Sequence, residues 1–262
     1  MINLKTPAEI ELMARAGRLL ASVTEELKLG CRVGVRTQEL DRLAQARITE
    51  GGARPGFLGY NGFPKSICVS INEEAVHGIP GRRRIEDGDV VSLDLGLVLE
   101  GFWADMGCTV LVGQPTAVAE KLVEVTDRCL ELAVEQAIVG NFLGDISAAV
   151  QSHAEGNGFS VIRQFVGHGI GRSMHEDTQV PNFGPPGKGV KLKAGMTLAI
   201  EPMINERGHE VYVKPDGWTV CTTDGGLAAY VEHTVAITPA GPRLLTVAGQ
   251  KTSPSKGSRV VR

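Results

Sequence analysis

Two carboxylates, Asp94 and Asp105, interrupt the long apolar stretch 90–112. β-Branched and leucine residues alternate on either side of 99–101, which predicts the two strands of a hairpin. A tight turn there would place Asp94 opposite Asp105, and any two- or four-residue loop would keep both on one face. An ionised carboxylate inside a hydrophobic sheet is costly unless a positive charge neutralises it. The pair therefore indicates a bound cation or a shared proton, with strand-end acids that reach solvent as the alternative.

The second half of the chain repeats this acid-bearing hairpin. Laying the hairpin over its copy matches Asp94 with Glu201. The same alignment matches Asp105 with Glu232. The repeated segments are 87–96 with 194–203, 104–112 with 231–238, and 77–80 with 168–171. Repeats of this kind predict two halves that face each other about a pseudo-twofold axis, with the four acids at the seam between them.

The remaining pattern predicts the same element order, helix, helix, strands, in both halves. Capping and periodicity predict four helices and two further strands. The helices are expected at 6–30, 37–50, 116–140 and 145–155, and the strands at 66–71 and 159–166. Residues 55–66 and 181–195 are rich in proline and glycine, which is typical of loops. We expect one α+β domain over residues 1–249, followed by a polar, disordered tail at 250–262.

Composition narrows the classes of function. Hydrophobic residues make up 42% of the 262 residues, which supports a large core, and the net charge of −3 argues against a DNA-binding protein. Its five cysteines are scattered, which favours neither a disulfide framework nor a thiolate zinc site. The sequence contains no apolar run long enough for a membrane span and no signal-peptide pattern at its start. We therefore expect a cytoplasmic protein that contacts no membrane.

The repeated acids and one glycine-flanked histidine form a set of candidate metal ligands: Asp94, Asp105, His168, Glu201 and Glu232. This set is too rich in carboxylates for a structural zinc site. Four carboxylates and one imidazole can hold two divalent ions, with acids bridging them and positions left for water. Such a pair lowers the pKa of a water and polarises a carbonyl, which is hydrolytic chemistry.

These residues also lie in motifs that match a known family. The set comprises Asp-x10-Asp, GHGIG-x3-HE, EPM and EHT, with NEEAVHGIP upstream. As a set it resembles type I methionine aminopeptidase of the short, bacterial-like form, from about Thr6 to Leu245. The resemblance implies a pita-bread fold of two pseudo-symmetric α+β halves around a dinuclear metal site. It also implies an enzyme that removes the initiator methionine from nascent proteins when the second residue is small.

On the family pattern, each ligand has an implied role. Asp94 would chelate one metal ion, Asp105 and Glu232 would bridge the two ions, and His168 and Glu201 would complete the shell of the other. The resemblance implies two divalent ions per chain, and cobalt, manganese, iron and zinc all suit such a site.

The resemblance also implies catalytic and substrate-binding roles for residues outside the ligand set. His77 would lie near the scissile amide nitrogen, His175 would donate a hydrogen bond to the substrate carbonyl, and Glu201 would relay the proton of the attacking water. The methionine pocket would be lined by Tyr60, Phe63, Cys68, Met174 and Trp218. Three wall positions depart from commoner family members, namely Phe63, Met174 and the pair Tyr230-Val231, which puts affinity rather than activity in question.

The expected partners are the N-termini of nascent polypeptides, and a monomer is expected. The basic run Arg82–Arg84 suggests a transient contact with ribosomal RNA, although such runs are usually solvated surface. Two alternatives stay open at this point. One is a proline-directed aminopeptidase of the same fold, which usually carries a large extra N-terminal domain for which this chain has no room. The other is a non-catalytic pita-bread binding protein, which typically lacks metal ligands.

Overall fold

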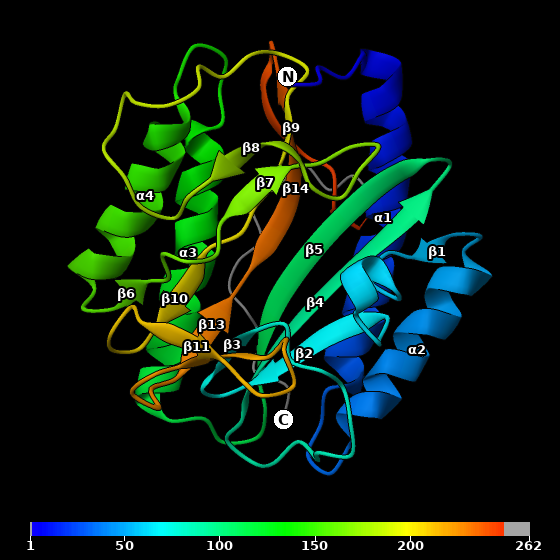
Figure 1. Ribbon diagram of the computed structural model, residues 1–262, viewed down its shortest axis with the longest axis vertical. Helices are drawn as coiled ribbons and strands as arrows, with labels where there is room; N and C mark the ends of the chain where they lie inside the picture. Colours follow the sequence, from blue (N-terminus) through cyan, green and yellow to red (C-terminus); the bar gives the residue numbers. More distant parts are fainter. Residues whose placement is uncertain (1, 249–262) are drawn as a thin grey trace.

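The computed structural model describes residues 2–248. The polar tail predicted at 250–262 lies outside these residues, as do the first and last positions of the predicted domain. Within them, long curved strands run between two pairs of helices (Figure 1). The first half of the chain carries α1 (Pro7–Gly30) and α2 (Thr37–Glu50), and the second half carries α3 (Ala117–Gln136) and α4 (Leu143–Gly156). No helix in this described part is long and apolar enough to cross a lipid bilayer.

Helix α1 (Pro7–Gly30) begins and ends where the sequence predicts. The Thr6 hydroxyl accepts a hydrogen bond from the Glu9 N–H at 3.3 Å, and the Glu9 carboxylate accepts one from the Thr6 N–H at 2.9 Å, which completes a capping box. The apolar stripe of α1 packs on the strands β4 and β5 together with the second helix, α2 (Thr37–Glu50). Both helices serve as scaffold for the hairpin.

The acid-bearing hairpin consists of β4 (Val90–Leu99) and β5 (Phe102–Leu111). The prediction that both acids share one face is confirmed, but the prediction that they are directly opposite is wrong. Asp94 pairs with Gly107, and Asp105 pairs with Gly96. The reason is the turn, which lies one residue further along than expected, at Glu100-Gly101, both with positive φ, so that the partner of each acid shifts by two residues. The two acids are therefore diagonal neighbours on the same face.

The main sheet has nine strands, and its centre confirms the pseudo-twofold arrangement. The order through the middle is β4-β5-β14-β9, so the two copies of the acid hairpin meet where β5 pairs with β14. Beyond them the sheet continues to β1 on one side and to β7 and β8 on the other, with β2 on β4 and β15 on β14. The other strands are β1 (Arg54–Pro55), β2 (Ile67–Ile71), β7 (Gly167–Gly169), β8 (Glu176–Val180), β9 (Thr197–Ile200), β14 (Glu232–Thr238) and β15 (Gly241–Leu244).

Two three-stranded sheets flank the main sheet. One contains β11 (Val211–Val213), β12 (Val220–Thr222) and β3 (Glu74–Val76), and the other contains β13 (Ala228–Tyr230), β10 (Met203–Asn205) and β6 (Ser160–Val161). The strand predicted over 159–166 is therefore wrong in length, because only two of its residues pair. The predicted loop 55–66 contains a short 3-10 helix, η1 (Tyr60–Gly62).

The second pair of helices repeats the scaffold role of the first. Helix α3 (Ala117–Gln136) is capped by Thr116 as predicted, but it ends four residues before Gly140. Helix α4 (Leu143–Gly156) follows, close to the predicted 145–155. Each half has its own hydrophobic core, formed in the second half by α3, α4, β9 and β14. The seam between the two cores holds the acids.

We expect Gly17→Ala to destabilise the fold. A Cβ atom at Gly17 would lie 2.2 Å from the Leu245 carbonyl oxygen, so α1 would have to move away from the end of the sheet. Overpacking of this kind typically costs about 1–3 kcal/mol in the free energy of unfolding. Gly156→Ala is the matched control, because nothing lies within 4 Å of a Cβ added there. Chemical denaturation of both variants checks the expectation, and equal midpoints would contradict it.

Candidate metal centre and active site

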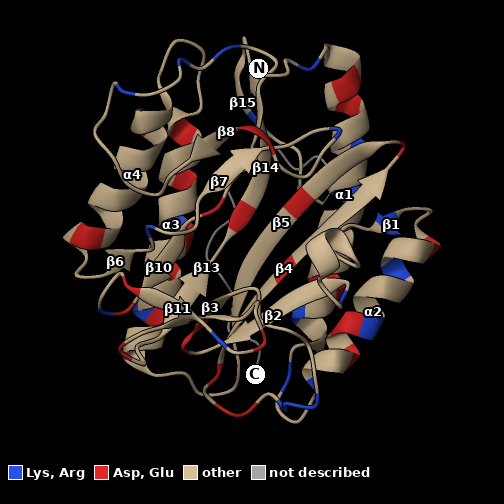
Figure 2. Ribbon diagram, viewed as in Figure 1, with Lys and Arg blue, Asp and Glu red and all other residues tan. Residues whose placement is uncertain are grey.

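The five predicted metal ligands lie around one cavity of about 100 Å³. Each comes from a different strand of the main sheet or from the residue directly after one. Asp94 lies on β4, Asp105 on β5, Glu232 on β14, His168 on β7, and Glu201 directly follows β9. Figure 2 shows acidic segments in the middle of β4 and β5, where the strands are otherwise uncharged. The duplication thus brings residues from distant parts of the sequence into one site.

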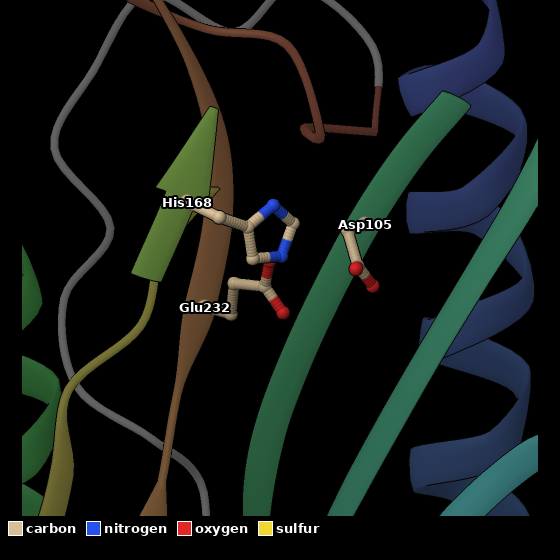
Figure 3. A group of neighbouring side chains, drawn as sticks. All are labelled: Asp105, His168 and Glu232. Atoms are coloured by element: carbon tan, nitrogen blue, oxygen red, sulfur yellow. The ribbon is translucent and has the colours of Figure 1, made fainter. Parts of the chain in front are cut away.

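Asp105, His168 and Glu232 form the tightest group. One ligand atom of each lies within 4.8 Å of the others, and all three residues are buried. Their side chains extend from β5, β7 and β14 into the same space (Figure 3). His168 Nδ1 lies 2.9 Å from the Gly169 carbonyl oxygen, and if the proton is on Nδ1, the lone pair of Nε2 faces the site. His168 Nε2 is also 3.6 Å from Glu201 Oε1, which adds a fourth residue to the group.

Burial and mutual repulsion make it unfavourable for these carboxylates to be ionised together. Burial raises the pKa of Asp94 to about 7. The pKa of Asp105 is raised well above its ordinary value, first by burial and then by the charges of Glu232 and Asp94. Burial and neighbouring acids likewise raise the pKa values of Glu201 and Glu232. A site of this kind requires added positive charge before all four acids can be ionised at neutral pH.

Two buried oxygens in the cluster have no hydrogen-bond partner within residues 2–248, Asp94 Oδ1 and Glu232 Oε1. An unpartnered buried carboxylate oxygen costs free energy unless something coordinates it. A carboxylate-rich set with one imidazole suits divalent cations that accept oxygen and nitrogen ligands. The residues therefore fit a metal centre, both in donor chemistry and in the atoms left free.

His77 reaches the cavity from the end of β3. Its backbone has a φ of 60°, a conformation that non-glycine residues rarely adopt. Gly78 follows, and it is packed so closely on β2 that a Cβ atom there would lie 2.2 Å from the Val69 carbonyl oxygen. The Gly78 N–H donates to Ser70 Oγ at 3.0 Å. Burial lowers the pKa of His77 to about 4, so its ring is neutral at physiological pH.

His175 reaches the cavity from the loop that directly precedes β8. Tyr60 Oη lies 2.7 Å from His175 Nδ1. When the hydroxyl donates, Nε2 carries the ring proton and can donate to a substrate oxygen. Burial lowers the pKa of His175 as well. The next residue, Glu176, forms a buried ion pair with Lys5 and accepts from the Arg172 N–H at 2.8 Å, which fixes the loop from two sides.

The residues predicted for the methionine pocket lie close together, beside the cavity rather than all around it. Phe63 and Cys68 belong to one apolar cluster, against which Met174 and Trp218 pack. The rings of Phe63 and Trp218 meet edge to face at 5.1 Å. Of the predicted pocket residues, Met174 also lines the cavity itself and so joins the two regions. Tyr60 contacts His175 instead, as described above.

Sequence reasoning missed several residues that line the cavity. They are Val76, Phe165, Val166 and Met203. Phe165 packs edge to face on the His77 ring at 5.5 Å. Tyr230, which was expected as a wall position, lines the cavity as well. For Phe165 the sequence offers only its position shortly before His168.

Comparisons with known proteins identify relatives over most of the chain. The model of metallopeptidase family M24 matches residues 11–239. A methionine aminopeptidase of Clostridium perfringens is 51% identical over 247 residues, which is 94% of this chain and 99% of that protein. The crystal structure of methionine aminopeptidase from Thermotoga maritima has a TM-score of 0.93 and 44% identity, and the match covers 94% of this chain and 100% of that one. A prolidase from Pyrococcus furiosus, at 23% identity and a TM-score of 0.75, shares the fold, and the match covers 66% of that chain.

The raised pKa values predict how the stability of the metal-free protein depends on pH. Between pH 7 and 8 the carboxyls of the unfolded chain are ionised, whereas the folded cluster retains protons. The folded state then binds more protons than the unfolded state, so the free energy of unfolding falls as pH rises, by up to about 1.4 kcal/mol per pH unit for each retained proton. Buried histidines contribute little there, because they are largely neutral in both states.

Thermal melts of chelator-treated protein at pH 7 and pH 8 measure this effect. Asp94→Asn is the matched variant, since it removes one titrating group while it preserves side-chain size, and its slope should be shallower. Loading with Mn²⁺ should reduce or reverse the fall. Identical slopes for the metal-free wild type and Asp94→Asn would contradict the role of the cluster.

Proposed function

The chain belongs to metallopeptidase family M24, among its methionine aminopeptidases, and we propose that it removes the N-terminal methionine from polypeptides whose second residue is small. As a metallopeptidase it is a hydrolase. One observation carries the proposal most directly: the carboxylate and imidazole cluster lies in the same cavity as two neutral histidines, His77 and His175. Ligands and hydrogen-bond donors thus surround one space where a peptide bond can lie.

The proposed centre holds two divalent ions. Asp94 would serve one ion, His168 and Glu201 the other, and Asp105 and Glu232 would bridge them. When bound, such ions lower the pKa of a water molecule and polarise a carbonyl group. Four carboxylates balance the charge of two divalent cations, which removes the repulsion that raises their pKa values in the metal-free protein. Cobalt, manganese, iron and zinc all match the donor set.

The protein's own side chains would handle the protons of the reaction. Glu201 borders the cavity, where its carboxylate would take a proton from the attacking water and pass it to the leaving amine. The Nε2–H of His175 would donate to the carbonyl oxygen as negative charge develops on it. His77, held on the other side, would contact the scissile amide nitrogen. Because both rings are neutral, they donate hydrogen bonds without adding repulsion to the cations.

The apolar cluster beside the cavity would receive the methionine side chain. A thioether packs well against aromatic edges, and Phe63 and Trp218 present such edges next to Met174. The second residue of the substrate would have to pass between the metal centre and the loops that carry His77 and His175. Both loops are tied down by backbone and ion-pair contacts, so a branched side chain there would displace the donors.

The proposed partners are the N-termini of nascent polypeptides in the cytoplasm, and the proposed working form is a monomer. We also propose a ribosome contact through Arg82–Arg84. Arg83 Nη1 already pairs with Glu74 Oε1 at 3.2 Å, and Arg84 donates to the Gly34 carbonyl oxygen. Arg82 would therefore have to carry most of that interaction.

Peptide assays test the proposed specificity. With metal added, Met-Ala-Ser and Met-Gly-Gly should be cleaved, whereas kcat/KM for Met-Leu-Ser should be lower by about 10²-fold or more, because a small misplacement of reacting groups has that effect. Ala-Ala-Ser should be poor, since it leaves the thioether site empty. Equal kcat/KM for Met-Ala and Met-Leu peptides would contradict the pocket assignment. Preference for Xaa-Pro substrates would favour the proline-directed alternative, and absence of all cleavage the binding-protein alternative.

His175→Ala separates catalysis from metal binding. If His175 stabilises the developing oxyanion, kcat should fall by about 10²-fold or more while the metal content, measured by atomic absorption, stays unchanged. Asp105→Ala is the contrasting variant, because it removes a proposed bridging ligand and should lose both metal and turnover. A change confined to KM in His175→Ala would instead assign that ring to ground-state binding.

A further inference from the structure

A buried phenol lies within the acid cluster and has no role in the function proposed above. Tyr230, the last residue of β13, is 3% exposed and lines the same cavity as the five candidate ligands. The Thr109 side chain holds its backbone from both sides, since the hydroxyl oxygen accepts from the Tyr230 N–H at 3.0 Å and its proton goes to the Tyr230 carbonyl oxygen at 2.7 Å. These two hydrogen bonds fix the backbone from which the Tyr230 ring extends.

The central strand makes room for this ring with a glycine. Gly107 on β5 pairs with Asp94 on one side and with Glu232 on the other. A Cβ atom at Gly107 would lie 2.0 Å from Tyr230 Cε1, so any other residue would push the ring away. Gly107 and Tyr230 thus fit each other, and together they place the phenol between two acids of the cluster.

The Tyr230 hydroxyl donates a hydrogen bond to Glu232 Oε2. The other oxygen of the same carboxylate, Oε1, is buried and has no partner within the described residues. The two oxygens therefore differ: one is held by the protein and one is left free. A hydrogen bond from a neutral donor fixes the rotation of a carboxylate without neutralising its charge.

We propose that Tyr230 is a positioning residue for the metal centre, whose hydroxyl orients Glu232 so that Oε1 is available to a divalent cation. The inference rests on the proposed function in that it takes the cluster as a metal centre, but it does not depend on the substrate. A tyrosine that only filled the space above Gly107 would tolerate phenylalanine, which has the same ring. A tyrosine that orients Glu232 would not.

Tyr230→Phe removes the hydroxyl and keeps the ring. Tyr212→Phe is the matched control, because it removes the same hydroxyl group from a residue that is 49% exposed on β11 and does not line the cavity. Titration calorimetry with Mn²⁺ and the visible absorption spectrum of the Co²⁺-loaded protein measure metal affinity and ligand geometry. In Tyr230→Phe we expect affinity weaker by about 10–100-fold, the usual effect of losing a partner of a metal ligand, and a changed Co²⁺ spectrum.

Wild-type affinity and an unchanged Co²⁺ spectrum in Tyr230→Phe would overturn the inference. A lower kcat at saturating metal with unchanged affinity would also overturn it, because the hydroxyl would then act on the substrate instead of through Glu232. Circular dichroism of the metal-free variants verifies that both are folded. Failure of the proposed function gives a different result from failure of this inference. In that case the wild-type protein would bind metal normally but cleave no methionyl peptide.

Discussion

The desolvation of four carboxylates at one seam is the constraint on which the rest of this structure depends. Water would stabilise each charge, but the two hydrophobic cores exclude it, and the acids raise one another's pKa values. The fold can tolerate such a seam only if cations or protons balance the charge. Asp94 and Glu232 each have an oxygen without a hydrogen-bond partner among residues 2–248, so this part of the protein leaves some of the balance open. A requirement for added positive charge is thus built into the folded state.

The duplicated hairpin explains how residues so far apart in sequence reach one point. Because β5 and β14 pair at the centre of the sheet, each half contributes an acid from its inner strand and one from, or directly after, the strand beside it. The helices cover the hydrophobic cores of the two halves. Glycines occupy the positions paired with two of the acids: Gly96 pairs with Asp105, and Gly107 pairs with Asp94. A Cβ atom at either glycine would clash with a neighbouring side chain. The sheet therefore positions the four acids relative to one another.

The face of the sheet on which each acid lies could be predicted from sequence, whereas the residue that each acid pairs with across the strands could not. Parity along a strand depends only on the even length of the turn, so the shared face of Asp94 and Asp105 was predicted correctly. Their register depends on which two residues adopt positive φ, and Glu100-Gly101 prevailed over the preceding pair because glycine adopts that conformation without strain. The five candidate ligands were identifiable because the repeat duplicated them. Phe165 and Val166 belong to no repeat or motif, and their place in the cavity follows from tertiary packing alone.

The loops that carry the two histidines show how far the site depends on distant parts of the chain. The loop of His77 is held by β2, through contacts that leave no space at Gly78. The loop of His175 is held by Lys5, which lies before the first helix and forms a buried ion pair with Glu176. A buried pair of this kind adds little net stability, because both charges lose their hydration, but it disfavours any arrangement that leaves one of them unpaired. The Lys5–Glu176 pair therefore acts on geometry, because it holds the loop that places the His175 ring at the cavity.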